Sequence, residues 1–164
     1  MITRAYLLAI TLLCFATLVR AERPHDWPYM EGSWRFESSN GYEAEIEYEI
    51  VAGGSAAIGR WTDKEGGQTI ETIGWRPNDK TMVSIGFGTG GKYWKREYTV
   101  VSKDKCTGKI LFVDPNGTII NGNSTLTRVG PDLITGELIG KTTDGKEVNM
   151  SVKFKRREST VNLK

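Results

Sequence analysis

Strict alternation of apolar and acidic side chains in residues 42–50 is the sequence feature that most limits the fold. The segment reads Tyr-Glu-Ala-Glu-Ile-Glu-Tyr-Glu-Ile, so apolar residues and glutamates occupy alternate positions throughout. Successive side chains of a β-strand point to opposite faces, whereas a helix would scatter both sets around its surface. The segment is therefore predicted to be a half-buried antiparallel strand with its glutamates on a solvated outer face.

Turn sequences divide the rest of the chain into short segments of similar length. Residues 114–117 read Asp-Pro-Asn-Gly and residues 143–146 read Thr-Asp-Gly-Lys, both typical of tight hairpins. No window shows a sustained helical period, and Ile, Val and Thr greatly outnumber Ala and Leu after residue 21. The segments between the corners predict about ten strands, near residues 32–38, 42–51, 55–62, 68–76, 80–88, 92–101, 107–114, 118–128, 132–141 and 146–157.

These strands predict an all-β fold, a single antiparallel up-and-down meander closed into a roughly ten-stranded barrel. Closure removes the two unpaired edges that an open sheet would leave. A two-sheet sandwich is the alternative, but it usually needs long crossover loops, and no loop here looks long enough. The predicted organisation is an extended lead-in over residues 22–30, one barrel domain over 31–158, and a flexible tail over 159–164.

The first 21 residues have the layout of a secretory signal peptide. Arg4 precedes a nearly unbroken apolar stretch over residues 5–19, and Val19 and Ala21 are tolerated at the last positions before a cleavage site. The stretch is shorter than the roughly 18 residues that span a bilayer, so an uncleaved anchor is the weaker alternative. We therefore predict cleavage, a secreted or periplasmic location, and no membrane association afterwards.

Charge and the inventory of reactive side chains exclude several classes of function. Of 22 basic residues Arg4 and Arg20 belong to the predicted signal peptide, which leaves 20 against 20 acidic residues and argues against a nucleic-acid partner. His25 is the only histidine, and Cys106 is the only cysteine outside the signal segment. We therefore predict no metal site and no cofactor.

The same inventory gives no assignable catalytic residue. A Ser–His–Asp triad would require the lead-in, which contains His25, to fold back onto the barrel. Acid–base chemistry by carboxylates stays open, but no spacing singles out a pair. Whether the protein is an enzyme is therefore left open, and the sequence favours a protein that is not one.

Aromatic residues in the predicted strands indicate either a lumen lined for a small ligand or an interior filled by side chains. Small barrels can hold one small molecule, but the burial of aromatic rings is by itself a sufficient reason for their presence. Arginines in strand centres could orient a polar group of a ligand, or lie on the solvent face in ion pairs. The candidate lumen residues are Phe36, Tyr48, Trp61, Trp75, Phe87, Trp94, Arg60 and Arg96.

Residues 30–34, Met-Glu-Gly-Ser-Trp, resemble the Gly-x-Trp signature of lipocalins and related calycin barrels. The resemblance implies that Trp34 closes one end of the barrel beneath an arginine of the last strand. Counting back by twos from Arg156 gives the apolar series Phe154, Val152, Met150 and Val148, so Arg156 shares their inward phase. We therefore predict the Arg156 guanidinium over the Trp34 ring.

Residues 68–77 and 83–91 are similar to a lipocalin-like domain of unknown function that occurs in secreted bacterial proteins, sometimes behind a ketosteroid-isomerase-like domain. The similar pattern is a Gly-Trp-x-Pro strand followed by a strand that ends in Phe-x-x-Gly-Gly, and it extends over most of residues 30–157. The sequence predicts no such companion domain, so a role in a two-domain enzyme is not carried over. The resemblance implies no catalytic residues.

The sequence thus predicts a secreted lipocalin-like barrel that binds a small, largely apolar molecule or a lipid. The competing prediction is a barrel with a filled interior that serves protein–protein interaction or a structural role, with a protein as its partner. An uncharacterised enzyme comes third. An open lumen above about 300 Å³ would favour the first prediction over the second.

Overall fold

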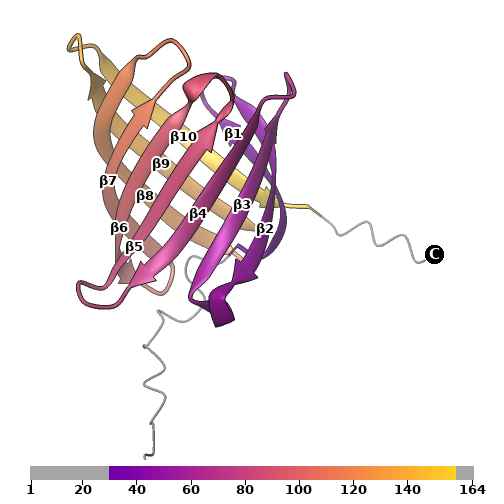
Figure 1. Cartoon of the computed structure of the whole chain (residues 1–164). Coiled ribbons are helices and arrows are strands. Elements are labelled where there is room, and N and C mark those ends of the chain that lie inside the picture. The colour runs from indigo at the N-terminus through magenta and orange to yellow at the C-terminus, as the bar shows by residue number, and fades with distance from the viewer. Residues whose placement is uncertain (1–29, 158–164) are drawn as a thin grey trace, which may run out of the picture.

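Ten strands pair in sequence order, each antiparallel to the next, and the first strand pairs with the last to close a barrel (Figure 1). The computed structural model describes residues 30–157, so the predicted signal peptide, most of the lead-in and the tail lie outside the described residues. The predicted all-β meander barrel is confirmed, and the sandwich alternative is excluded. The strands are β1 (Gly32–Ser38), β2 (Glu43–Val51), β3 (Ala56–Asp63), β4 (Gln68–Arg76), β5 (Thr81–Gly88), β6 (Tyr93–Ser102), β7 (Lys105–Val113), β8 (Ile119–Gly130), β9 (Leu133–Thr142) and β10 (Glu147–Arg156).

Strand β2 alternates as its sequence predicts. Ala44, Ile46 and Tyr48 are buried in the interior, whereas Glu45, Glu47 and Glu49 are exposed. Neighbouring strands repeat the pattern. Paired residues of adjacent strands lie on the same face of the sheet, so every second residue of each strand points into the barrel. The hydrophobic core therefore fills the inside of the barrel.

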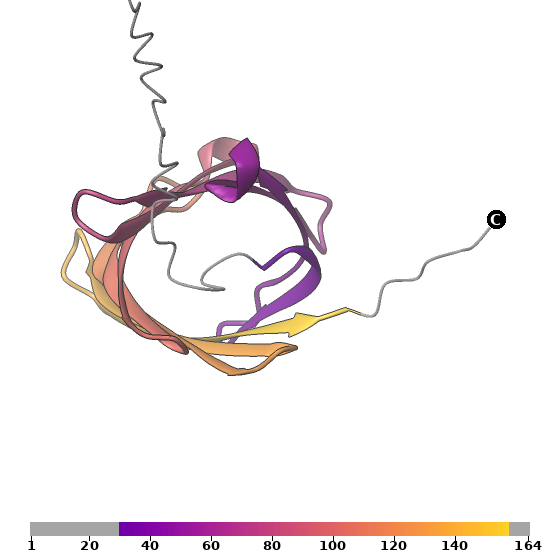
Figure 2. The ribbon, with the colours of Figure 1, turned by 90° about the horizontal axis from the view of Figure 1, so that it is seen from below.

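Antiparallel connections alternate between the two ends of the barrel. One end carries the connections β2–β3, β4–β5, β6–β7 and β8–β9, together with the start of β1, and we call it the Met30 end. Figure 2 looks onto this end, where the short 3₁₀ turn η1 (Ala52–Gly54) lies at the rim. A second 3₁₀ turn, η2 (Thr89–Gly91), lies at the opposite end. Within residues 30–157 no helix is long and apolar enough to cross a membrane.

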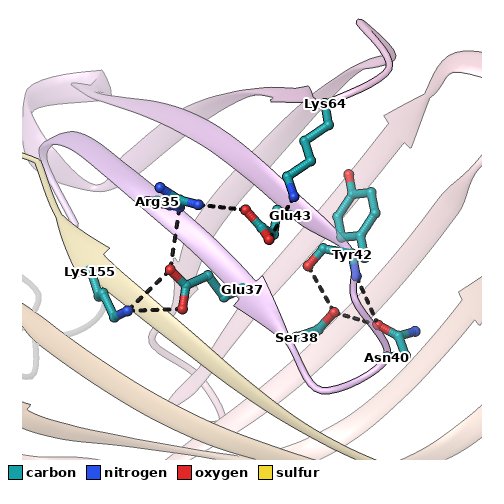
Figure 3. A network of polar contacts seen from close by, with 8 residues as sticks. All are labelled: Arg35, Glu37, Ser38, Asn40, Tyr42, Glu43, Lys64 and Lys155. Carbon is teal, nitrogen blue, oxygen red and sulfur yellow. Dashed lines mark hydrogen bonds and ion pairs between the residues drawn. The ribbon is translucent and has the colours of Figure 1, made fainter.

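A ladder of ion pairs on the outer face crosses the seam between the first and last strands (Figure 3). Lys155 of β10 pairs with Glu37 of β1 at 2.9 Å, and Arg35 pairs with Glu37 at 3.3 Å and with Glu43 of β2 at 2.6 Å. Lys64 contacts the other oxygen of Glu43 at 2.7 Å. Hydrogen bonds from Lys64 and Arg35 lower the pKa of Glu43. Single exposed pairs stabilise little, but this set joins β10, β1, β2 and the β3–β4 turn and supports the register of the three strands.

The β1–β2 turn is closed by polar contacts that Figure 3 also shows. Ser38 Oγ donates to the Tyr42 carbonyl at 2.9 Å and also lies against the Asn40 side chain. Gly41 has φ +88°, a conformation that glycine adopts without steric cost. The turn residues therefore match the tight reversal between the two strands.

Trp34 and Arg156 meet at the Met30 end, as the sequence predicts. They are register partners of β1 and β10, and the Arg156 Cζ lies 4.4 Å from the centroid of the buried Trp34 ring. Arg156 Nη1 donates to the Glu31 carbonyl at 2.7 Å, and its Nε lies 3.2 Å from Asp132. Trp34 Nε1 donates to the Met30 carbonyl at 2.8 Å. These contacts tie both chain ends of the barrel to one another.

Arg156→Ala is expected to lower the free energy of unfolding by about 1–2 kcal/mol, because it removes the cation–π contact and the bond to Glu31. The matched control is Arg157→Ala, which removes only an exposed ion pair with Glu45 at 2.6 Å and should cost less than about 1 kcal/mol. Urea unfolding followed by circular dichroism compares the two variants. Equal losses would contradict a closing role for Arg156.

Candidate functional site

An aromatic cluster fills the part of the interior next to β1, β3, β6 and β10. Its rings meet edge to face, with centroids 4.9 Å apart for Phe36 and Phe154, 5.3 Å for Phe36 and Trp61, and 5.4 Å for Trp61 and Trp94. Tyr42 extends the cluster at 5.9 Å from Phe36. Edge-to-face packing at these separations is favourable and leaves little room between the rings. These aromatic residues therefore form a filled core.

Beside this cluster, the buried carboxylate of Glu71 on β4 accepts hydrogen bonds from four side chains. Glu71 is only 1% exposed. Its Oε2 accepts from Tyr48 Oη at 2.7 Å and from Trp61 Nε1 at 3.0 Å, and its Oε1 accepts from Trp94 Nε1 at 3.3 Å and from Ser84 Oγ. An ionised carboxylate has about four acceptor positions, so the donors occupy them all. Glu71 thereby connects β2, β3, β5 and β6 through the interior.

Two inward-facing glycines make room for the aromatic donors of this network. Gly59 is the register partner of Tyr48, and a Cβ built on it would lie 2.5 Å from the Tyr48 ring. Gly86 is the partner of Trp94, and its Cβ would lie 2.3 Å from that ring. Each ring thus lies directly over a glycine, where any side chain would collide with it. From this position the polar atom of each ring reaches Glu71.

Arg96 brings a positive charge into the same region from β6. Its Cζ lies 5.2 Å from the Trp94 ring centroid, and its Nε is buried with no hydrogen-bond partner in the part of the chain that the structure describes. Burial opposes the charged form, but the electrostatic effects of Tyr98, Glu71 and Tyr48 outweigh it and raise the pKa of Arg96. The guanidinium therefore stays protonated, with one N–H left to donate.

A partly enclosed cavity of about 30 Å³ connects these charged groups to the Met30 end. Its polar lining consists of Tyr48, Glu71, Ser84, Arg96 and Tyr98, and its apolar lining of Met30, Ile73, Met82, Leu126 and Phe154. One water needs roughly 10–15 Å³ by this kind of measure, whereas pockets for drug-sized ligands span about 300–1,000 Å³. The cavity as it stands therefore accommodates a group of a few atoms.

Both tyrosines of the lining remain phenols at neutral pH. Burial, followed by the adjacent Glu71 charge, raises the pKa of Tyr48 well above its ordinary value, and burial raises the pKa of Tyr98. The Tyr48 hydroxyl donates to Glu71, and the Tyr98 hydroxyl shares a hydrogen bond with Ser124 Oγ at 3.1 Å. The phenols are thus engaged within the protein, unlike Arg96 Nε.

The predicted lumen residues divide between cavity, core and outer surface. Tyr48 and Arg96 line the cavity, and Phe36, Trp61 and Trp94 belong to the buried core. A sixth candidate, Trp75, is partly buried and packs against that core.

Phe87 and Arg60, by contrast, do not lie in the lumen, and these two predictions are corrected. Phe87 is 66% exposed, because β5 turns Met82, Ser84 and Gly86 inward and places Phe87 on the opposite, outward-facing set of residues. Arg60 pairs with Glu49 at 3.3 Å on the outer face, since Trp61 takes the inward position next to it. Phe87 contacts Tyr93 on the outside, with ring centroids 5.2 Å apart.

Sequence reasoning missed Glu71, Ser84 and Tyr98. In β4 the two alternating sets are similarly mixed in polarity, so parity alone cannot tell which faces inward. The signal that could have found the site is the pair Gly59 and Gly86, because strand glycines often mark a close approach of an aromatic ring.

The site offers no evident metal or acid–base chemistry. Among residues 30–157 no group of three or more His, Cys, Asp or Glu side chains is placed to hold a metal ion. The acceptor positions of Glu71 are taken by its four donors, so a general base would first have to break one of those bonds. The arrangement is better suited to holding a bound group than to transferring a proton.

Cys106 lies in the core near this region, and we expect it to be unreactive in the folded protein. Its side chain is fully buried, and burial raises its pKa to about 12, so the reactive thiolate is scarce at neutral pH. An aromatic disulfide reagent should label it at neutral pH only after unfolding in urea, which absorbance measurements would show. Fast labelling of the native protein would contradict this placement.

No protein-family model matches this chain, and no curated protein matches it either. Solved structures similar to this chain include designed barrels. A redesigned β-barrel is 15% identical, with 79% of this chain and 93% of that chain covered and a TM-score of 0.36. A protein described as EF1p2_mFAP2b bound to DFHBI is 12% identical, with coverage of 82% and 99% and a TM-score of 0.41. A de novo fluorescence-activating barrel is 20% identical, with coverage of 79% and 94% and a TM-score of 0.33.

Proposed function

We propose that this lipocalin-like barrel binds a small, largely apolar molecule or a lipid at the Met30 end, with Arg96 as the contact for its polar group. The observation that carries the proposal is the buried Arg96 Nε, which has no partner among the described residues and belongs to a side chain lining the cavity. An unsatisfied buried donor is costly, and a ligand acceptor would remove that cost. The contact between Arg156 and Trp34 supports the lipocalin-like assignment.

Binding requires the apolar lining to move, because the cavity of about 30 Å³ admits only the polar end of such a ligand. Met30 and Met82 are the side chains best able to do so, since methionine has several rotatable bonds and adapts to irregular shapes. The apolar remainder of the ligand would then lie against Ile73 and Leu126. The Glu71 network and the aromatic cluster would stay in place as a rigid floor.

The test is titration of the barrel with a panel of fatty alcohols, acids, esters and aromatic dyes. Binding is followed by tryptophan fluorescence and native mass spectrometry. Arg96→Met should lower the affinity for the probes that bind about 10–100-fold, the usual effect of losing a hydrogen bond to a charged group. The matched control is Arg60→Met, because Arg60 lies on the outer face in an exposed ion pair. Failure of every probe to bind the wild-type protein would favour the alternative, a filled barrel with a structural or protein-binding role.

We further propose that the protein acts in a secreted or periplasmic compartment. The basis is the layout of residues 1–21, which lie outside the described part of the structure. Amino-terminal sequencing of the exported protein should then begin at Glu22. A soluble product that still begins at Met1 would count against export.

A further inference from the structure

We infer that the ligand group received by Arg96 is an uncharged hydrogen-bond acceptor, such as the oxygen of an amide, ester, ketone or alcohol, rather than a carboxylate. The inference rests on the proposed ligand-binding function and names the chemical class of the ligand. It follows from the balance of charge around the cavity, which already contains one fixed anion.

Arg96 and Glu71 are the two charged side chains that line the cavity. Both contact Trp94, which donates to Glu71 Oε1 at 3.3 Å and whose ring centroid lies 5.2 Å from the Arg96 Cζ. Their formal charges cancel, and the charge of Glu71 contributes to keeping Arg96 protonated. Within residues 30–157, the least exposed ion pair is Lys92 with Asp63, which lies at the opposite end of the barrel and is neutral by itself, with its atoms 3.4 Å apart.

What Arg96 lacks is therefore a hydrogen bond and not a counter-charge. A neutral acceptor at Nε supplies that bond and leaves the charge around the cavity at zero. A carboxylate would supply the same bond but would add a second anion beside Glu71, in a region where buried charge without its own partner is costly. Glu71 cannot relieve the repulsion by rotating away, because four donors from four strands hold it.

Size does not make this choice. An amide and a carboxylate have the same shape and nearly the same volume, so a cavity of about 30 Å³ treats them alike. The two groups differ in charge, and the negative charge of Glu71 repels a carboxylate but not an amide. Decanamide and decanoate are therefore matched probes, with the same alkyl chain and the same planar head group.

The experiment measures the affinities of decanamide and decanoate for the wild-type protein and for Glu71→Gln at neutral pH, by competition with a bound apolar fluorophore. We expect the wild-type protein to bind decanamide at least about tenfold more tightly than decanoate. In Glu71→Gln the cavity lining is left with the positive charge of Arg96 alone, and we expect decanoate to bind at least as tightly as decanamide. Glu49→Gln is the control, because Glu49 lies on the outer face and should leave the preference unchanged.

Each result has a distinct meaning. If neither probe nor the fluorophore binds the wild-type protein, the proposed function fails. If the probes bind but decanoate is preferred by the wild-type protein, the inference is overturned while the proposed function stands. A preference that survives in folded Glu71→Gln also overturns it.

A second measurement covers the case in which Glu71→Gln does not fold. The affinity of decanoic acid for the wild-type protein is compared at neutral pH and at about pH 3.5, below the ordinary pKa of about 4.3 that an alkyl carboxyl such as that of glutamate has in water. Decanamide is measured in the same buffers to correct for changes in the protein. The acid should gain affinity relative to the amide when it is uncharged, and an unchanged ratio would overturn the inference.

Discussion

Glu71→Ala is expected to lower the free energy of unfolding by about 3–5 kcal/mol, the range for removing one partner from a buried charge network. The substitution leaves Tyr48, Trp61, Ser84 and Trp94 without their common acceptor in the interior, and each unsatisfied buried donor is costly. It also leaves the partly buried Arg96 without the negative charge that offsets it. Urea unfolding monitored by circular dichroism measures the loss.

Glu49→Ala provides the matched control for this prediction. Glu49 lies on the outer face of β2, and its exposed ion pair with Arg60 at 3.3 Å should contribute less than about 1 kcal/mol. Glu71→Gln should fall between the two, because the amide fills the same space and keeps one acceptor oxygen. If Glu71→Ala were no less stable than Glu49→Ala, the network would not be a main support of the interior.

Gly86→Ala is expected to cost about 1–3 kcal/mol, as overpacking of a well-filled core usually does. The new methyl group would lie 2.3 Å from the Trp94 ring, so the ring has to move and its bond to Glu71 is weakened. The loss should be accompanied by a change in the near-ultraviolet circular dichroism and in tryptophan emission. Denaturant unfolding gives the magnitude, and the spectra show whether the indole has moved.

Gly74→Ala is the control, because the methyl group there meets no atom within 4 Å. The same substitution should change stability by less than about 1 kcal/mol, with a small gain from the stiffer unfolded chain. If Gly86→Ala and Gly74→Ala changed the free energy of unfolding equally, the space over Gly86 would not be what allows Trp94 to pack there.

The architecture could be predicted because it depends on local patterns. In β2 the two faces differ so sharply in polarity that alternation alone shows which one is buried. The meeting of Trp34 and Arg156 could likewise be predicted, since parity along β10 and the closure of a meander bring the two together. Both predictions use the period of a strand and the adjacency of the first and last strands.

The functional interior depends on contacts between strands that are distant in sequence. Phe87 and Ser84 lie on opposite faces of β5, and hydrophobicity alone suggests that the phenylalanine is inside. The opposite holds because Ser84 and Gly86 leave the space that Trp94 and the Glu71 carboxylate occupy. Residues on other strands thus decide which face of β5 is buried, and the sequence of β5 alone does not show it.

The sequence by itself thus determined the strand order, the inward face of β2 and the closure of the barrel, because these follow from the alternation of side chains and from short connections. Only the tertiary structure decided that the aromatic residues fill the core, that Arg60 and Phe87 lie outside, and that Arg96 borders a small cavity beside a buried carboxylate. The physical reason is that packing in three dimensions selects, among faces of similar polarity, the one whose shapes and hydrogen bonds fit together.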